Sequence, residues 1–350
     1  MLHRLLRIAC VVLALAQAPT SIAAIPDAER QTLIAIYEST NGGAWGNNIN
    51  WCTTWPCPAQ NPTFAPPGTE CYDGDEYNGW YGVECDDARA HVVAINLSSN
   101  RLSGSLPSLA GLLNLEVLLL DANDLSGELP DLGGLTSLRF FGASANHFAG
   151  SIPRLDGLSS LEAYLVDANQ LTGPLPSLDG LPALEVFSAR ANRLTGSIPD
   201  LHGHRALITF NVALNDLTGP IPDLSGLVAL QYFFVDYNHL SGPLPPLSGL
   251  HALLQFIANS NELTGSIPDL PSSLLQLRVG VNRLTGAVPA APPNLWQSES
   301  SLCANPLDLT PSANDAGWDA ATGHSPWWAD PSPGMRCDGL FVGGFEFEYL

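Results

Sequence analysis

Two short segments of the chain carry residues of the types that hold metal ions. His202 and His204 flank a single glycine, and two imidazoles at that spacing can share one ion. Residues 73–79, DGDEYNG, are acidic but depart from the calcium-loop pattern, because Tyr77 occupies the fifth position and glycine the seventh. We expect a solvated loop at the histidines and a solvated acidic segment at 73–79, with a metal ion at either place as the alternative.

Motifs of enzymatic catalysis are missing from the sequence. It contains no G-x-S-x-G, no H-E-x-x-H and no G-x-G-x-x-G in a suitable context. All 13 basic residues are arginine, which excludes a Schiff-base lysine and a P-loop lysine. We therefore expect a protein that is not an enzyme and uses no cofactor.

The charge of the chain restricts its partners. The formal net charge is −21 at pH 7, and a strongly acidic protein repels nucleic-acid phosphates and anionic membranes. No segment after residue 24 reaches the roughly 18 apolar residues of a membrane span. We expect neither a nucleic-acid partner nor a membrane span, and we expect a monomer.

Residues 1–24 have the pattern of a secretory signal peptide. Arg4 and Arg7 precede the apolar run IACVVLALA, which the small-residue region SIAA follows. This pattern predicts a secreted, extracellular protein, with the periplasm or the cell surface as alternatives.

Six cysteines lie after residue 24, an even number that is typical of disulfides in exported proteins. Spacing alone does not fix their pairing. We expect the pairs Cys52–Cys57, Cys71–Cys85 and Cys303–Cys337, with a zinc site as the alternative.

A repeat occupies the chain between these cysteines. The octet LTGSIPDL stands at residues 194–201 and again at 263–270, three steps of 23 residues later. An asparagine followed by x-L-x-G-x-[ILV]-P recurs nine times, at steps of 23 except for a last step of 21. These asparagines are Asn100, Asn123, Asn146, Asn169, Asn192, Asn215, Asn238, Asn261 and Asn282.

Each repeat predicts one coil of a solenoid, because units that recur at such a period stack on one another. Counted back from the asparagine, positions −5 and −3 are apolar and alternate with other positions, as in a short strand. Position −5 is aromatic in six successive repeats, and position −3 is then Ala or Val. Large and small side chains are exchanged at roughly constant volume, so we expect both columns in the core. The asparagine amide should satisfy backbone groups left open by the bend that ends each strand.

The repeat resembles the plant-type leucine-rich repeat (LRR), L-x-x-L-x-L-x-x-N-x-L-x-G-x-[IL]-P, over roughly residues 92–305. The resemblance implies an α/β solenoid, a right-handed horseshoe with a parallel β-sheet on its concave face and disulfide-stabilised caps. Residues 25–91, with a helix over DAERQTLIAIYESTNGG that Asp27 can cap, form the expected N-terminal cap. Residues 306–350 form the expected C-terminal cap and an irregular tail. The N-terminal cap and the GFE-containing tail are similar to those of secreted bacterial repeat proteins.

Such solenoids bind partners through exposed positions of the concave sheet, which are −6, −4, −2 and −1 here. One repeat places Tyr232, Phe234, Asp236 and Tyr237 at these four positions. Exposed aromatic clusters often mark binding sites, although Tyr and Phe are also ordinary sheet residues. The other candidate ligand-binding residues on this face are Phe140, Asp121, Asp167 and Arg190.

These features bear on four possible functions. We favour a recognition module for a protein, peptide or glycan. A structural or adhesive component of the cell surface is the alternative. Ice binding needs a regular Thr or Asn column, and the −4 column is irregular. An enzyme lacks the required motifs.

Overall fold

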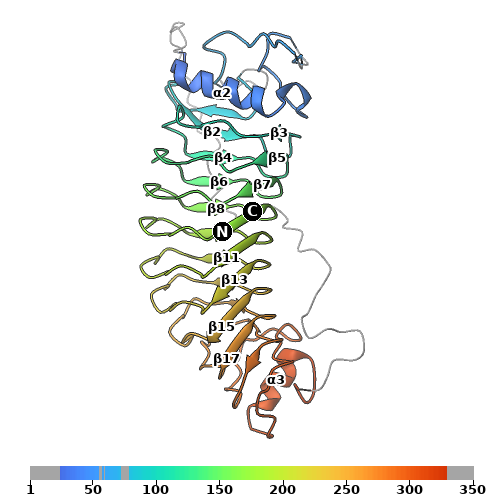
Figure 1. The fold of residues 1–350 in the computed structure, drawn as a ribbon. Helices are drawn as coiled ribbons and strands as arrows, with labels where there is room; N and C mark the ends of the chain where they lie inside the picture. Colours follow the sequence, from blue (N-terminus) through green and yellow to red (C-terminus); the bar gives the residue numbers. More distant parts are fainter. Residues whose placement is uncertain (1–23, 55–56, 59, 72–78, 329–350) are drawn as a thin grey trace.

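A computed structural model of the chain describes residues 24–54, 57–58, 60–71 and 79–328. The expected signal peptide, nearly all of the acidic segment 73–79, Cys337 and the GFE-containing tail lie outside the described residues. The described part is a tall, slightly twisted column of stacked coils with a helix at each end (Figure 1).

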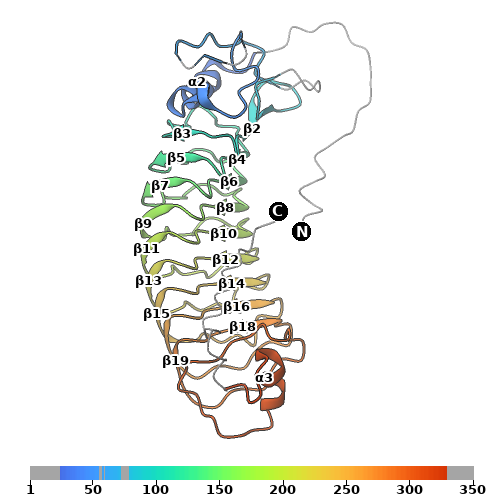
Figure 2. The ribbon, with the colours of Figure 1, turned by 90° about the vertical axis from the view of Figure 1, so that its right-hand side faces the viewer.

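The coils form two sheets that run along the whole column. In the first sheet, β1 is antiparallel to β2, and every later strand is parallel to its neighbours. Its strands are β1 (Val83–Cys85), β2 (Val92–Asn96), β4 (Val117–Leu119), β6 (Phe140–Gly142), β8 (Ala163–Leu165), β10 (Val186–Ser188), β12 (Thr209–Asn211), β14 (Tyr232–Phe234), β16 (Gln255–Ile257) and β18 (Gln276–Arg278). Figure 2 shows the column bowed, with this sheet on the inner side. The expected parallel sheet on a concave face is therefore confirmed.

The second sheet has nine parallel strands, which the sequence analysis did not anticipate. They are β3 (Ser103–Gly104), β5 (Asp124–Gly127), β7 (His147–Gly150), β9 (Gln170–Pro174), β11 (Arg193–Gly196), β13 (Asp216–Gly219), β15 (His239–Pro243), β17 (Glu262–Gly265) and β19 (Arg283–Leu284). Each strand from β5 onward begins at the residue after a repeat asparagine, and β3 begins three residues after Asn100. Within the described repeats both flanks are strands, so the expected horseshoe solenoid is built from β-structure in its coils and has its helices α2 and α3 at the two ends.

The −5 and −3 columns lie inside the coils, as expected. The six aromatic rings stack with centroids 5.1 to 5.8 Å apart and planes within 12 to 19° of each other. The rings belong to Phe141, Tyr164, Phe187, Phe210, Phe233 and Phe256, and each is at most 1% exposed. Tyr164 places its hydroxyl in this apolar stack without a hydrogen-bond partner.

The repeat asparagines tie each coil to the one before it. The Nδ2 of Asn169 donates to Val166 O in its own coil and to Ala143 O in the preceding coil, at 3.2 and 3.0 Å. Its Oδ1 accepts a hydrogen bond from Phe148 N at 3.0 Å. The expectation that these amides satisfy open backbone groups is confirmed. Asn305, 23 residues after Asn282, is a further rung that the sequence analysis missed; it donates to Val279 O and accepts from Leu284 N.

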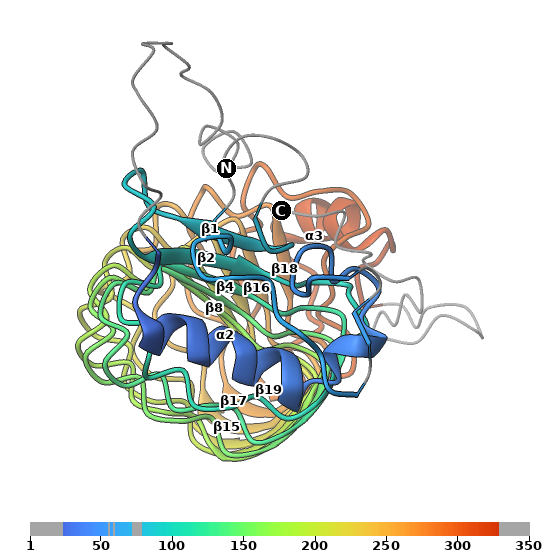
Figure 3. The same cartoon turned by 90° about the horizontal axis from the view of Figure 1, so that it is seen from above.

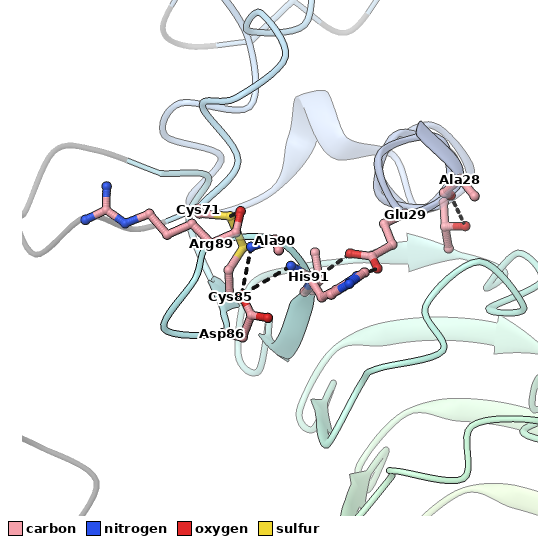
Figure 4. Close-up of polar contacts among 10 residues, drawn as sticks. Ala28, Glu29, Cys71, Cys85, Asp86, Arg89, Ala90 and His91 are labelled. Carbon is pink, nitrogen blue, oxygen red and sulfur yellow. Dashed lines mark hydrogen bonds and ion pairs between the residues drawn. A yellow bond between two sulfur atoms is a disulfide. The ribbon is translucent and has the colours of Figure 1, made fainter. Parts of the chain in front are cut away.

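Helix α2 (Asp27–Ser39) lies across the first coil (Figure 3). The carboxylate of Glu29 accepts a hydrogen bond from Val92 N at 2.7 Å and contacts His91 Nδ1 at 2.7 Å, which anchors the helix to β2 (Figure 4). Asp27 does not cap the helix: Pro26 is the capping residue and makes no side-chain cap bond. Asp27 instead lies in the first turn of the helix, where the positive end of the helix dipole stabilises its negative charge.

The N-terminal cap also holds a short 3₁₀ helix, η1 (Gly42–Ala44), and a buried ion pair between Arg30 and Glu70. The Arg30 guanidinium lies 5.1 Å from the ring centroid of Trp80. The ion pair with Glu70 and the aromatic face of Trp80 together offset the cost of removing the Arg30 charge from water.

Two of the three expected disulfides are present. Cys52 pairs with Cys57 and Cys71 pairs with Cys85, both with Cα atoms 5.4 Å apart. The third expected pair involves Cys337, outside the described residues, and remains a prediction.

The other end of the column is closed by helix α3 (Asp315–Thr322), in a segment expected to be irregular. Trp318 is fully buried, and its indole nitrogen donates to Pro289 O at 2.8 Å. Trp318 therefore anchors this helix to the last coils, together with the backbone bonds that Ser298 N and Ser300 N donate to Ala320 O and Ala321 O.

Candidate functional site

Four side chains of one coil form what we call the β14 patch: Tyr232, Phe234, Asp236 and Tyr237. Tyr232 and Phe234 stand two residues apart in β14, so both point to the same face of the sheet. Phe233 between them is fully buried, which places its two neighbours on the concave surface. The rings of Tyr232 and Phe234 have centroids 6.2 Å apart and planes tilted by 45°.

Uncharged residues flank this aromatic pair on both neighbouring strands. Tyr232 is in register with Thr209 of β12 and Gln255 of β16. Phe234 is in register with Asn211 and Ile257 on the same two strands. The patch is therefore an apolar surface with amide and hydroxyl groups beside it.

Tyr237 has an unusual backbone for a large side chain. Its φ is 51°, in the left-handed region. The residue at every −1 position of the described repeats also has a φ in this region. Earlier coils place alanine there, at Ala122, Ala145, Ala168 and Ala191. Leu214 in the preceding coil and Val281 in a later coil share the conformation, so it belongs to the repeat and does not by itself mark Tyr237 as functional.

Two of the three candidate aspartates hold the scaffold together. Asp121 Oδ1 accepts a hydrogen bond from Ser144 N of the next coil at 2.8 Å. Asp167 Oδ1 accepts from Arg190 N and from the hydroxyl of Ser188, both at 2.6 Å. Each carboxylate thus binds the backbone amide 23 residues further on, and both serve the stacking of coils.

Asp236 occupies the same −2 column but is not used in this way. Among the residues that the structure describes, no other residue donates a hydrogen bond to its carboxylate, and no ion pair reaches it. Burial raises the pKa of Asp236 to about 6, and the distant charges of Arg190 and Arg278 lower it only in part. Asp236 is the member of the column with acceptor capacity left for a partner.

The remaining candidates lie on the same face but away from the β14 patch. Phe140 is on β6, four coils from β14, which corresponds to roughly 19 Å at the usual strand spacing. The guanidinium of Arg139 lies 5.3 Å from the Phe140 ring centroid and is itself paired with Glu162. Arg190 lies two coils before Asp236 and is exposed. The structure therefore gathers four of the eight predicted ligand-binding residues in one place.

The expectation for His202 and His204 is half wrong. His202 is exposed, but His204 is only 5% exposed, and its Nδ1 has no hydrogen-bond partner. His204 stands 23 residues from both Leu181 and Leu227 and takes the place of their side chains in the coil. The two imidazoles lie in different surroundings. No group of three or more His, Cys, Asp or Glu residues in the described ranges could hold a metal ion.

The second sheet carries a hydroxyl column that the sequence analysis did not weigh. It consists of Ser103, Ser126, Thr172, Thr195, Thr218, Ser241, Thr264 and Thr285, interrupted by Ala149. Several of these hydroxyls donate to a glycine carbonyl of the preceding coil, for example Thr172 to Gly150 O at 3.3 Å. The column thus supports the ladder between coils.

No protein-family model and no curated protein matches the chain. Solved structures do match it. The chain is 33% identical to the LRR ectodomain of the plant membrane receptor kinase GASSHO1/SCHENGEN3 from Arabidopsis thaliana, in complex with CASPARIAN STRIP INTEGRITY FACTOR 2. That match covers 65% of this chain and 29% of the ectodomain, with a TM-score of 0.62.

Two other structures extend this likeness. PEPR1, solved with AtPEP1, is 30% identical over 79% of this chain and 38% of its own, with a TM-score of 0.63. The plant peptide hormone receptor RGFR1, solved with RGF2, is 28% identical over 61% of this chain and 40% of its own, with a TM-score of 0.50. The chain therefore spans well under half of each of these proteins.

A plant ice-binding protein shares the fold alone, at 21% identity and a TM-score of 0.51. Within the described residues, no helix combines the length and apolarity needed to cross a membrane. Geometry and comparisons agree that the fold is a leucine-rich repeat solenoid of the plant type.

Proposed function

We propose that this protein is a non-enzymatic recognition module that binds a peptide or protein, or alternatively a glycan, through its concave sheet. The observation that carries the proposal is the β14 patch, where two aromatic rings and an unused carboxylate share the surface of one coil. Clustered aromatic residues supply most of the binding energy in many interfaces. The plant receptor ectodomains with this fold, solved with their ligands, support a peptide as the partner.

We further propose that the protein acts outside a bacterial cell, as a monomer. The signal-like residues 1–24 and the two disulfides of the N-terminal cap support export, because disulfides persist in oxidising compartments. Sequencing the N-terminus of the exported protein tests this: a mature chain that begins near residue 25 supports it, and an intact Met1 on a cytosolic protein contradicts it.

The binding proposal is tested with the purified mature protein on an array of secreted proteins, peptides and cell-wall glycans. The double variant Tyr232→Ala/Phe234→Ala is compared with the parent. Leu113→Ser/Val228→Ser is the matched control, because it also removes two exposed apolar side chains but from loops that precede the strands.

We expect at least one array ligand that the parent and the control bind and the Tyr232→Ala/Phe234→Ala variant does not. A ligand that still binds this variant would place the binding site on the caps or loops instead of the β14 patch. The absence of any ligand favours the alternative of a structural or adhesive protein.

A further inference from the structure

Asp236 differs from the equivalent carboxylates in what surrounds it. Asp121 and Asp167 are satisfied by the backbone amides of Ser144 and Arg190, each one coil further on. The corresponding residue for Asp236 is Asn259, whose amide forms no hydrogen bond to the carboxylate. The scaffold therefore stacks at this coil without using the Asp236 side chain.

No cation of the described chain neutralises Asp236. Arg190 and Arg278 are the arginines that influence it, and each lies two coils away along the sheet, on opposite sides. Arg278 is already engaged with the carboxylate of Glu299 at 2.8 Å. Ala213 separates Arg190 from Asp236 in the −2 column and brings no polar group.

The aromatic rings beside Asp236 favour the same kind of ligand group. Tyr232 and Phe234 share its face of the sheet, and the faces of aromatic rings attract guanidinium and ammonium groups within about 6 Å. A carboxylate can bind the charge of a cation while aromatic rings on the same face of the sheet pack against its apolar stem. The chain's net charge of −21 adds a long-range attraction for cationic partners.

We infer that Asp236, Tyr232 and Phe234 form a subsite for the cationic side chain, arginine or lysine, of a bound peptide. This inference rests on the proposed function and adds to it the chemical class of the residue that the concave sheet selects. The raised pKa of Asp236 agrees with this inference. Burial without a nearby cation disfavours the charged carboxylate, and the cationic side chain of a bound peptide would stabilise that charge.

The test selects binders from a phage-displayed library of random heptapeptides, in parallel on the parent, on Asp236→Asn and on Asp216→Asn. Asp216 is a matched control, since it is an exposed aspartate on β13 of the opposite sheet. The tightest peptide is then synthesised with its arginine and with uncharged citrulline in its place.

We expect arginine and lysine to be enriched in peptides selected on the parent and on Asp216→Asn, but not on Asp236→Asn. Citrulline should weaken binding to the parent by about tenfold or more and change binding to Asp236→Asn little. Selected peptides without such enrichment, or with equal enrichment on Asp236→Asn, overturn the cation subsite and leave the recognition proposal standing. A library that yields no binder overturns both for peptides.

Discussion

Phe233 and Phe234 are neighbours in β14 but belong to two regions of the molecule. Phe233 stacks between Phe210 and Phe256 inside the coils, at centroid distances of 5.6 and 5.4 Å. Phe234 lies on the concave surface between Asn211 and Ile257, where neighbouring coils carry unlike residues. The interior repeats because every coil presents the same environment, whereas the surface varies because stacking does not constrain it. The departures from the repeat are therefore where function is expected.

The largest difference between the regions should appear in stability. Phe210→Ala removes one ring from the middle of the buried stack and should lower the free energy of unfolding by about 3–5 kcal/mol. Tyr232→Ala on the surface should lower it by less than about 1 kcal/mol. Urea unfolding followed by circular dichroism measures both. Equal losses for the two variants would show that the two regions are not distinct.

A smaller loss is expected from the asparagine ladder. Asn169→Ala leaves Phe148 N without its acceptor and removes one of the two asparagine donors of Ala143 O and of Val166 O, and should cost about 2–3 kcal/mol. Asn294→Ala is the control, since within the described residues the side chain of this exposed asparagine donates one bond, to Ser272 O. If both variants unfold at the same urea concentration, the ladder does not hold the coils together.

Asp236→Asn should make the protein more stable at neutral pH, by about 1–2 kcal/mol after allowance for solvent screening. Burial raises the pKa of Asp236 to about 6, so the folded state holds the proton more tightly than the unfolded chain. The charged form is disfavoured in the fold, and parent stability falls as pH rises from about 4 through 6. Urea unfolding at pH 3.5 and 7.5 checks this: the gain should be present only at the higher pH, and a loss at pH 7.5 would indicate a structural role.

The smallest effect is expected inside the stack. Tyr164→Phe removes a buried hydroxyl that has no hydrogen-bond partner and keeps the ring, so stability should rise by about 1 kcal/mol. Thermal unfolding gives the comparison. A destabilised variant would mean that the hydroxyl has a partner in solution, such as a buried water.

The interior of the fold could be predicted from the sequence because each core residue recurs in the same environment every 23 residues. The −5 aromatics and the asparagine amides are in this class, whereas the two disulfides lie in the N-terminal cap, outside the repeat. The second sheet was missed because its strands are two to five residues long and all but β19 contain Gly, which is a poor strand signal. His204 was wrongly predicted to be solvated because it was considered as half of a histidine pair. It instead replaces the buried leucine that stands at the same repeat position in neighbouring coils, at Leu181 and Leu227.

The site was predictable only in outline. Position within the repeat places Tyr232, Phe234 and Asp236 on the concave face. It does not distinguish Asp167 from Asp236, because that difference depends on which backbone amide lies within reach of each carboxylate. Phe140 was chosen for its type and position, but the sequence does not show that Arg139 stacks on its ring.

The central claim is that the β14 patch binds a partner and does not hold the fold. The most direct measurement determines, in one preparation, the Kd of the best array ligand and the urea unfolding curve for the parent and for Tyr232→Ala/Phe234→Ala. We predict a Kd at least tenfold higher for the variant, with stability within about 1 kcal/mol of the parent. An unchanged Kd, or a higher Kd accompanied by loss of the folded state, would contradict the claim.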